Sequence, residues 1–176
     1  MEYGNKTSFA VEFDLDKNHG GEWLYGRICF WIGGSQVGNF ELGTSLRDVL
    51  FEMKYLVSDC GSRDGSTLCS LSQSDAFFAI DSLLYGDGRN ARSGMPETPA
   101  RFDITIPVDV FDEWKVYLFE CEESARIVFK KNSETQVRSH LLMRGEFDRV
   151  INETYRNLDQ LYDKEETAGS KSGRKK

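Results

Sequence analysis

Two carboxylates and a histidine near the N-terminus come closest to a catalytic set. Asp14 and Asp16 are two positions apart in an alternating segment, so both side chains project from one face of a strand, and His19 follows in a glycine-rich turn. Such a trio could hold a divalent cation or activate water, which makes a small metal-dependent hydrolase one alternative reading. However, metal sites usually gather more ligands, and neither His19 nor His140 lies in a known nucleophile motif. We therefore predict no catalytic residue, no metal site and no cofactor.

The four cysteines are the other candidates for chemistry. Cys60 and Cys69 have eight residues between them, too many for the spacing of a zinc knuckle. We expect all four (Cys29, Cys60, Cys69 and Cys121) to be free thiols, as in a reducing compartment. The chain also lacks an apolar stretch near the roughly 20 residues that span a bilayer, and its start is unlike a secretory signal. These features predict a cytoplasmic protein without membrane contact.

The charge of the chain is acidic. The net charge is −7, and the last six residues carry +4, so the first 170 residues carry −11. An acidic surface with so few catalytic groups favours binding to a basic protein partner over enzymatic activity. Four cations on the basic end would give only weak, salt-sensitive contacts with nucleic acid, so no direct nucleic-acid binding is expected.

Hydrophobic periodicity predicts the elements that position these residues. Residues 8–16 alternate as a half-buried strand, and residues 23–32 are apolar on both faces, as in a central strand. Apolar residues from Leu46 to Val57 recur with helical spacing, after Ser45 and Asp48 as a capping pair. The remaining predictions are a helix at 74–85, a strand at 101–106 and a hairpin over 114–131.

The order of these elements favours an α+β fold. We expect an antiparallel sheet of five or six strands with helices packed on one face and a C-terminal helix. Residues 1–165 are expected to form one domain, of which 133–165 is the helical C-terminal part. Residues 166–176 are predicted to be a disordered basic tail.

Several sequence runs resemble the immunity protein 42 family of bacterial polymorphic-toxin systems. They are Gly21–Gly34, Leu42–Lys54, Pro99–Ile106 and Trp114–Glu120, and the resemblance spans roughly residues 8 to 130. These runs consist mostly of fold-forming aromatic residues and glycines. The region from Ser133 to Tyr162 has no counterpart in the family pattern as we read it, and is interpreted as an extension.

The resemblance implies an antitoxin, a small protein that binds and neutralises a cognate toxin C-terminal domain. That partner is expected to be basic and to be a nuclease, delivered by contact-dependent inhibition or secretion. The resemblance implies no catalytic residues. A secretion chaperone or adaptor that uses the 44–57 helix or the C-terminal helix is a further alternative, and the choice between monomer and homodimer is left open.

Acidic side chains on two segments are the candidate toxin-binding residues. They are Glu12, Asp14 and Asp16 on the first strand, and Glu120, Glu122 and Glu123 at the end of the hairpin strand 114–120. A carboxylate row of this kind could copy the phosphates of a nucleic acid; the simpler reading is a solvated strand face. The long loop 86–100 is expected to be mobile and to contribute to binding.

Three aromatic residues alternate on the second strand, at positions 23, 25 and 31. Trp23, Tyr25 and Trp31 would suit an interface, because Trp and Tyr are frequent among the residues that dominate binding energy. A central strand has both faces covered, so we expect them to lie in the core instead.

Overall fold

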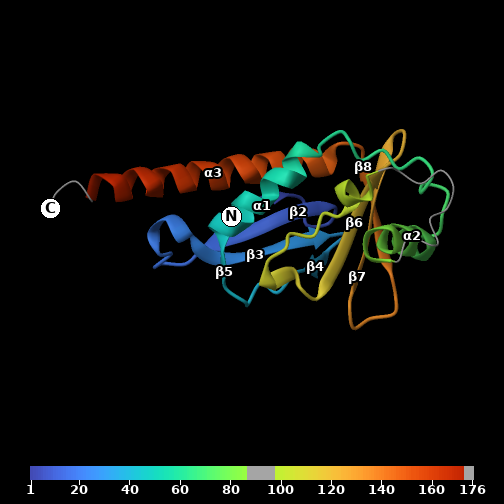
Figure 1. Ribbon diagram of the computed structural model, residues 1–176, viewed down its shortest axis with the longest axis horizontal. Coiled ribbons are helices and arrows are strands. Elements are labelled where there is room, and N and C mark those ends of the chain that lie inside the picture. The colour runs from blue at the N-terminus through green and yellow to red at the C-terminus, as the bar shows by residue number, and fades with distance from the viewer. Residues whose placement is uncertain (87–97, 173–176) are drawn as a thin grey trace.

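Two antiparallel β-sheets and three α-helices make up the part of the chain that the structure describes (Figure 1). This computed structural model describes residues 1–86 and 98–172. Sheet A has the order β1-β2-β3-β4, with β5 also paired to β3, and sheet B has the order β6-β7-β8. The predicted α+β class with antiparallel strands and a C-terminal helix is confirmed, although the strands are divided between two sheets.

The strands and helices have the following bounds. Sheet A contains β1 (Glu2–Gly4), β2 (Phe9–Leu15), β3 (Tyr25–Ile32), β4 (Ser35–Val37) and β5 (Thr44–Ser45). Sheet B contains β6 (Trp114–Glu120), β7 (Ser124–Lys131) and β8 (Arg138–Met143). The α-helices are α1 (Leu46–Ser58), α2 (Gln73–Tyr85) and α3 (Glu146–Ser172), and short 3₁₀ turns are η1 (Gly21–Trp23), η2 (Pro99–Phe102) and η3 (Asp109–Phe111).

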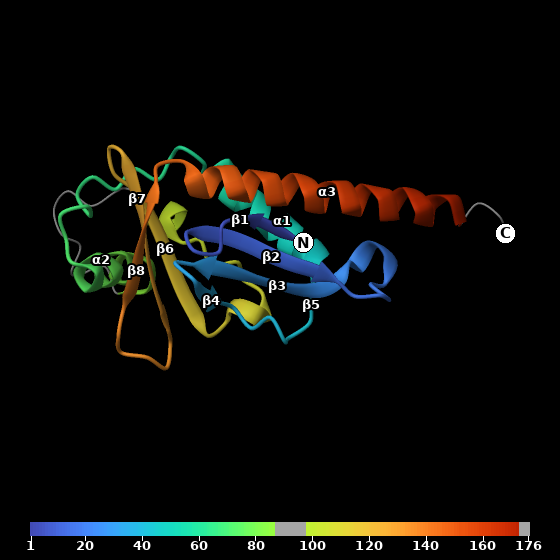
Figure 2. The ribbon, with the colours of Figure 1, turned by 180° about the vertical axis from the view of Figure 1, so that it is seen from behind.

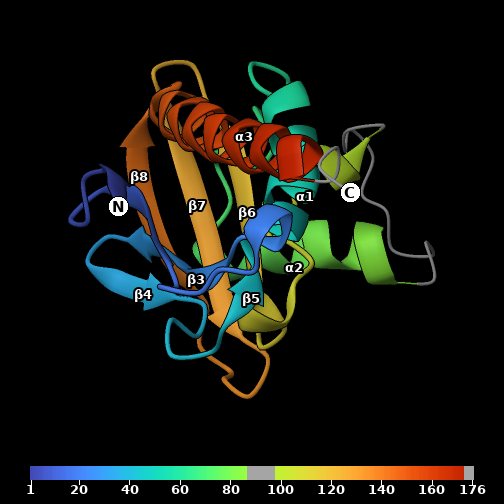
Figure 3. The same cartoon turned by 90° about the vertical axis from the view of Figure 1, so that its left-hand side faces the viewer.

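Sheet B lies in the middle of the molecule, with sheet A on one side and α2 on the other (Figures 1 and 3). Val116 and Leu118 of β6 pack into the larger core, which sheet A, α1 and α3 share. Tyr117 and Phe119 project the other way and pack on α2 in a second core. Side chains alternate along a strand, so these four residues make both faces of β6 apolar. This is the pattern of a strand in a sheet that is covered on both faces.

Helix α1 forms where the periodicity predicts it. Leu46, Val49 and Met53 are buried, and the hydroxyl of Ser45 accepts a hydrogen bond from the backbone N–H of Asp48 at 3.2 Å. This contact satisfies one of the free donors at the helix start, and the Asp48 carboxylate lies at the positive end of the helix dipole. The predicted capping pair is therefore confirmed.

Helix α3 runs alongside β1 and β2 and extends past the end of sheet A (Figure 2). Its apolar stripe, which includes Phe147, Ile151 and Leu158, is buried against the larger core. The helix continues to Ser172, although the sequence predicted disorder from residue 166. Within the described ranges, no helix is both long and apolar enough to cross a membrane.

Two other secondary-structure predictions are wrong. The region 133–165 is not wholly helical, since β8 lies within it and pairs with β7 along the whole of β8. The segment 101–106 is not a regular strand: η2 covers its start, and only a single bridge joins Asp103 to Tyr117 of β6. In both cases strand pairing decided the local structure: β8 forms a hairpin with β7, whereas 101–106 has only one bridge to a strand.

The prediction of four free thiols is wrong for one pair of cysteines. Cys69 and Cys121, which are 52 residues apart, form a disulfide that joins the α1–α2 connection to the end of β6. Cys29 and Cys60 are free, and burial raises the pKa of the Cys29 thiol to about 12. Spacing could not reveal the disulfide, because only the fold brings these two residues together.

Candidate functional site

The acidic row on β2 is partly neutralised by the chain itself. The carboxylate of Glu12 accepts hydrogen bonds from the indole N–H of Trp31 and from the amine of Lys6, both at 2.7 Å. The bond from Lys6 is the main reason that the pKa of Glu12 lies below its ordinary value. Lys6 also lies 3.4 Å from Glu2 of β1. Glu12 is thus a member of an internal polar network on the outer face of sheet A.

The other two carboxylates of this row are exposed. Asp14 lies 2.8 Å from the N-terminal amine of Met1, while Asp16 extends past the end of β2 into solvent. Asp14 therefore has a local cation of its own. Toxin binding by Glu12, Asp14 and Asp16 remains a prediction.

The acidic residues around the β6–β7 turn also divide into two kinds. Glu120 is only 4% exposed; its carboxylate lies 3.3 Å from the guanidinium of Arg144 and accepts the backbone N–H of Gly145 at 3.3 Å. Glu122 and Glu123 are exposed in the turn. Glu120 thus connects the hairpin to the start of α3, whereas the two turn residues present their charge to solvent.

Asp16, at the end of β2, and the β6–β7 turn lie toward opposite ends of α3. Glu146, in the first turn of the helix, accepts a hydrogen bond from Ser8 at 2.6 Å, and Gly145 before it contacts Glu120. Glu165, near the other end, lies 3.3 Å from His19. From Glu146 to Glu165 the helix rises about 28 Å. Exposed charges are screened over about 8 to 10 Å, so the charge of Asp16, three residues before His19, acts separately from that of the β6–β7 turn.

The catalytic trio of the hydrolase alternative is not assembled. The imidazole of His19 faces Glu165, and the carboxylate of Asp14 faces the N-terminal amine. In the described part of the chain, no group of three or more His, Cys, Asp or Glu residues could hold a metal ion.

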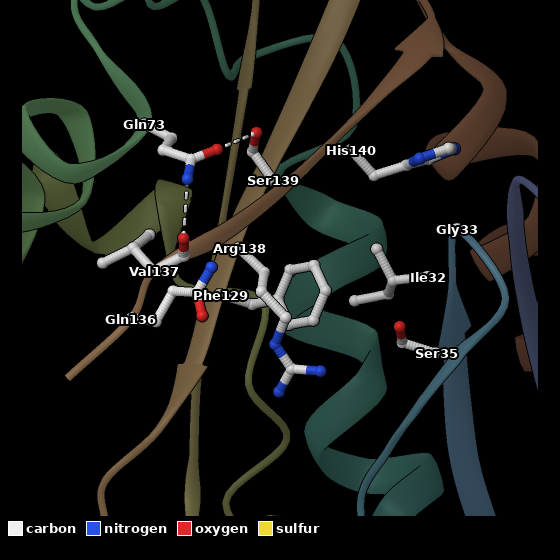
Figure 4. A pocket seen from close by; sticks show the side chains of 10 residues that line it. All are labelled: Ile32, Gly33, Ser35, Gln73, Phe129, Gln136, Val137, Arg138, Ser139 and His140. Atoms are coloured by element: carbon white, nitrogen blue, oxygen red, sulfur yellow. Dashed lines mark hydrogen bonds between the residues drawn. The ribbon is translucent and has the colours of Figure 1, made fainter. Parts of the chain in front are cut away.

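A pocket of about 300 Å³ lies between the β3–β4 turn, β8 and the start of α2, and its lining includes a serine and a histidine (Figure 4). Ser139 and His140 are neighbours on β8, but the Ser139 hydroxyl donates to the side-chain oxygen of Gln73 at 2.8 Å. The Gln73 amide donates in turn to the carbonyl of Val137. His140 packs against Gly33 instead, so no nucleophile–base pair forms here.

Trp23 and Tyr25 are not in the core. Their side chains are 42% and 45% exposed, and their rings stack with centroids 6.2 Å apart. The guanidinium of Arg47 lies 3.5 Å from the ring of Trp23. Between the two aromatics, buried Leu24 adopts a left-handed backbone with φ of 50°, which turns its neighbours outward. Trp31 is half-buried, so the core prediction is wrong for the first two aromatics.

A groove between α1 and α2 is a feature that the sequence did not predict. It has a volume of about 470 Å³, and we call it the α1–α2 groove. Its lining residues come from three separate segments: Glu52, Tyr55, Leu56 and Asp59 of α1; Leu84 and Tyr85 of α2; and Ala100, Asp103, Thr105, Ile106 and Pro107. The predicted binding loop 86–100 follows α2, but residues 87–97 lie outside the described residues.

Comparisons with known proteins give a consistent result. A family model described as Immunity protein 42 matches residues 1–157. The crystal structure of CdiI from Burkholderia dolosa AUO158 superposes with a TM-score of 0.73 at 19% sequence identity, covering 89% of this chain and 99% of that chain. No curated protein matches. The family match includes β8 and the first part of α3, so this region is not the extension that we expected.

Proposed function

This chain belongs to the immunity protein 42 family, and from that premise we propose that it is an antitoxin that binds and neutralises a cognate toxin domain in the cytoplasm. The observation that carries the proposal is the extent of the family match. It covers both sheets, α1, α2 and the packed part of α3, which together are nearly all of the described structure. In this proposal the protein acts by binding, and the contacts of His19 with Glu165 and of Ser139 with Gln73 are consistent with that role.

The proposed partner is a basic toxin domain, and a nuclease is the class that fits best. A nuclease needs a positively charged surface to hold phosphates, and this chain carries a net charge of −7. The exposed carboxylates Asp14, Asp16, Glu122 and Glu123 would attract such a surface from a distance. Complementary charge of this kind raises the association rate more than it raises the final affinity. Glu12 and Glu120 would contribute mainly by fixing the surfaces around them.

Co-expression with the toxin C-terminal domain encoded immediately upstream tests this function. We expect growth to be rescued and a stoichiometric complex to co-purify, with an association rate that falls as salt is added. Toxin activity should be absent in the purified complex, whereas a partner that stayed active would indicate an adaptor or chaperone. Failure to rescue growth and to bind would contradict the antitoxin role.

A further inference from the structure

Large aromatic side chains are exposed at the α1–α2 groove. Tyr55 of α1 is 57% exposed and Tyr85 of α2 is 63% exposed, and both line the groove. Phe51, one turn before Tyr55 on α1, is also exposed and contacts the edge of Tyr162 on α3. Large exposed aromatic side chains that line a hollow are typical of binding sites.

The groove is also acidic. Glu52, Asp59 and Asp103 line it, and none of the described lining residues is basic. The carboxylate of Asp103 is fixed in place, because it accepts the Tyr85 hydroxyl at 3.0 Å and the backbone N–H of Thr105 at 2.9 Å. Burial, followed by the charge of Asp103, raises the pKa of Tyr85 to about 12. Lys115 contacts the Tyr85 ring, but it forms an ion pair with Asp81.

A buried arginine fixes the segments that form the walls. Arg63 is 1% exposed, and its guanidinium donates to the carbonyl of Leu56 at 2.7 Å and to the carbonyl of Arg101 at 2.9 Å. It also pairs with Asp148 of α3 at 3.0 Å. These bonds connect the end of α1 to the segment that carries Asp103. The groove is therefore formed before any partner arrives, which reduces the entropy lost on binding.

We propose that the α1–α2 groove is the anchoring site for a lysine or arginine side chain on the surface of the cognate toxin. The aliphatic part of that side chain would pack on Leu56, Leu84 and Ile106, and its cationic end would meet the carboxylates between the two tyrosine rings. This inference rests on the proposed antitoxin function and names the surface and the chemistry that it uses.

The groove and the exposed carboxylates then have different kinetic roles. Asp14, Asp16, Glu122 and Glu123 lie apart on open surface, where charge acts mainly on encounter. The groove combines aromatic rings, carboxylates and apolar side chains. Residues of these kinds in a hollow contribute most of the binding energy and act mainly on the dissociation rate. Groove variants are expected to raise the dissociation rate, and variants of the exposed carboxylates to lower the association rate.

Surface plasmon resonance with an inactive form of the upstream-encoded toxin domain tests the proposal. Tyr55→Ala is expected to raise the Kd by about 30-fold, mainly through faster dissociation, while Tyr55→Phe, which keeps the ring, stays near wild type. The double variant Glu52→Lys/Asp59→Lys should raise the Kd at least about 10-fold.

The matched controls are Tyr25→Ala, at an exposed tyrosine of β3, and Glu22→Lys, at an exposed glutamate of η1. Each should change the Kd by no more than about 2-fold. Circular dichroism and thermal unfolding of every variant check that the fold is intact.

The outcomes separate this inference from the proposed function. If the wild type binds the toxin and protects cells, but the groove variants bind as the wild type does, the groove assignment is wrong and the antitoxin function is unaffected. Weakening by the Tyr25 and Glu22 controls alone would overturn the groove in favour of the η1 end of sheet A. If the wild type neither binds nor protects, both proposals fail.

Discussion

The row of carboxylates on β2 and the α1–α2 groove are both acidic, but the fold treats their charges differently. On β2, Lys6 bonds to Glu12 and the N-terminal amine bonds to Asp14. In the groove, Glu52, Asp59 and Asp103 line the wall beside two tyrosines, and the described cations next to them, Lys54 and Lys115, contact the tyrosine rings. The number of acids in a segment is therefore a poor guide to the potential at the surface, because cations from other segments decide how much charge remains.

The two regions also differ in what holds them in shape. The β2 row needs no special support, since the sheet ladder with β3 fixes the backbone positions of Glu12 and Asp14. The groove is made of helix and loop segments, whose arrangement depends on Arg63 and on the Cys69–Cys121 disulfide in the connection between α1 and α2. Three measurements of stability test this difference between the two regions.

The largest effect is expected from removing the buried arginine. Arg63→Met should lower the free energy of unfolding by about 3 to 5 kcal/mol, because the Asp148 carboxylate and the carbonyls of Leu56 and Arg101 lose their partner. Urea denaturation measures this loss. Arg149→Met is the matched control, since Arg149 is exposed and its ion pair with Glu153 is long, at 3.7 Å; it should cost under about 0.5 kcal/mol. Equal effects would mean that Arg63 does not connect the groove walls.

The disulfide should have the next largest effect. Its 52-residue separation implies a loss of at most about 4 kcal/mol when it is broken, from the entropy that the unfolded chain regains. The double variant Cys69→Ala/Cys121→Ala should show a lower melting temperature, and a reducing agent should lower that of the wild type but not that of the double variant. An unchanged wild-type melting temperature under reducing conditions, with free thiols confirmed by titration, would contradict a stabilising role.

The β2 network is expected to give the smallest effect, with a characteristic pH dependence. Because the pKa of Glu12 is lowered in the folded protein, its contribution is present above its unfolded pKa, ordinarily near 4.5, and is lost as the pH falls through the folded value. Glu12→Gln should cost less than about 1 kcal/mol at pH 7, since the Glu12–Lys6 pair lies at the surface, where water screens it. Denaturation of both proteins between pH 3 and 7 should show this difference shrinking at low pH; a difference independent of pH would show that the Lys6 pair contributes nothing.

Local patterns predicted the elements of this fold well. The helical spacing from Leu46 to Val57 and the Ser45–Asp48 cap depend only on residues within one or two turns, and α1 forms as expected. The alternation in residues 8–16 likewise predicted β2, with Phe9, Val11 and Phe13 buried. Where strand pairing was decisive, as in the β7–β8 hairpin and at the single bridge of Asp103, the local pattern gave the wrong element.

The candidate site shows the same difference between what local patterns predict and what contacts between segments decide. The sequence alone determined the acidic charge, the α+β class and the resemblance to immunity proteins, because composition, periodicity and short motifs are properties of neighbouring residues. Only the tertiary structure decided which charges stay exposed, that Cys69 meets Cys121, and that Tyr55, Tyr85 and Asp103 share one groove. The physical reason is that burial, ion pairing and cavities depend on distances between segments, and those distances are fixed only when the sheets and helices pack together.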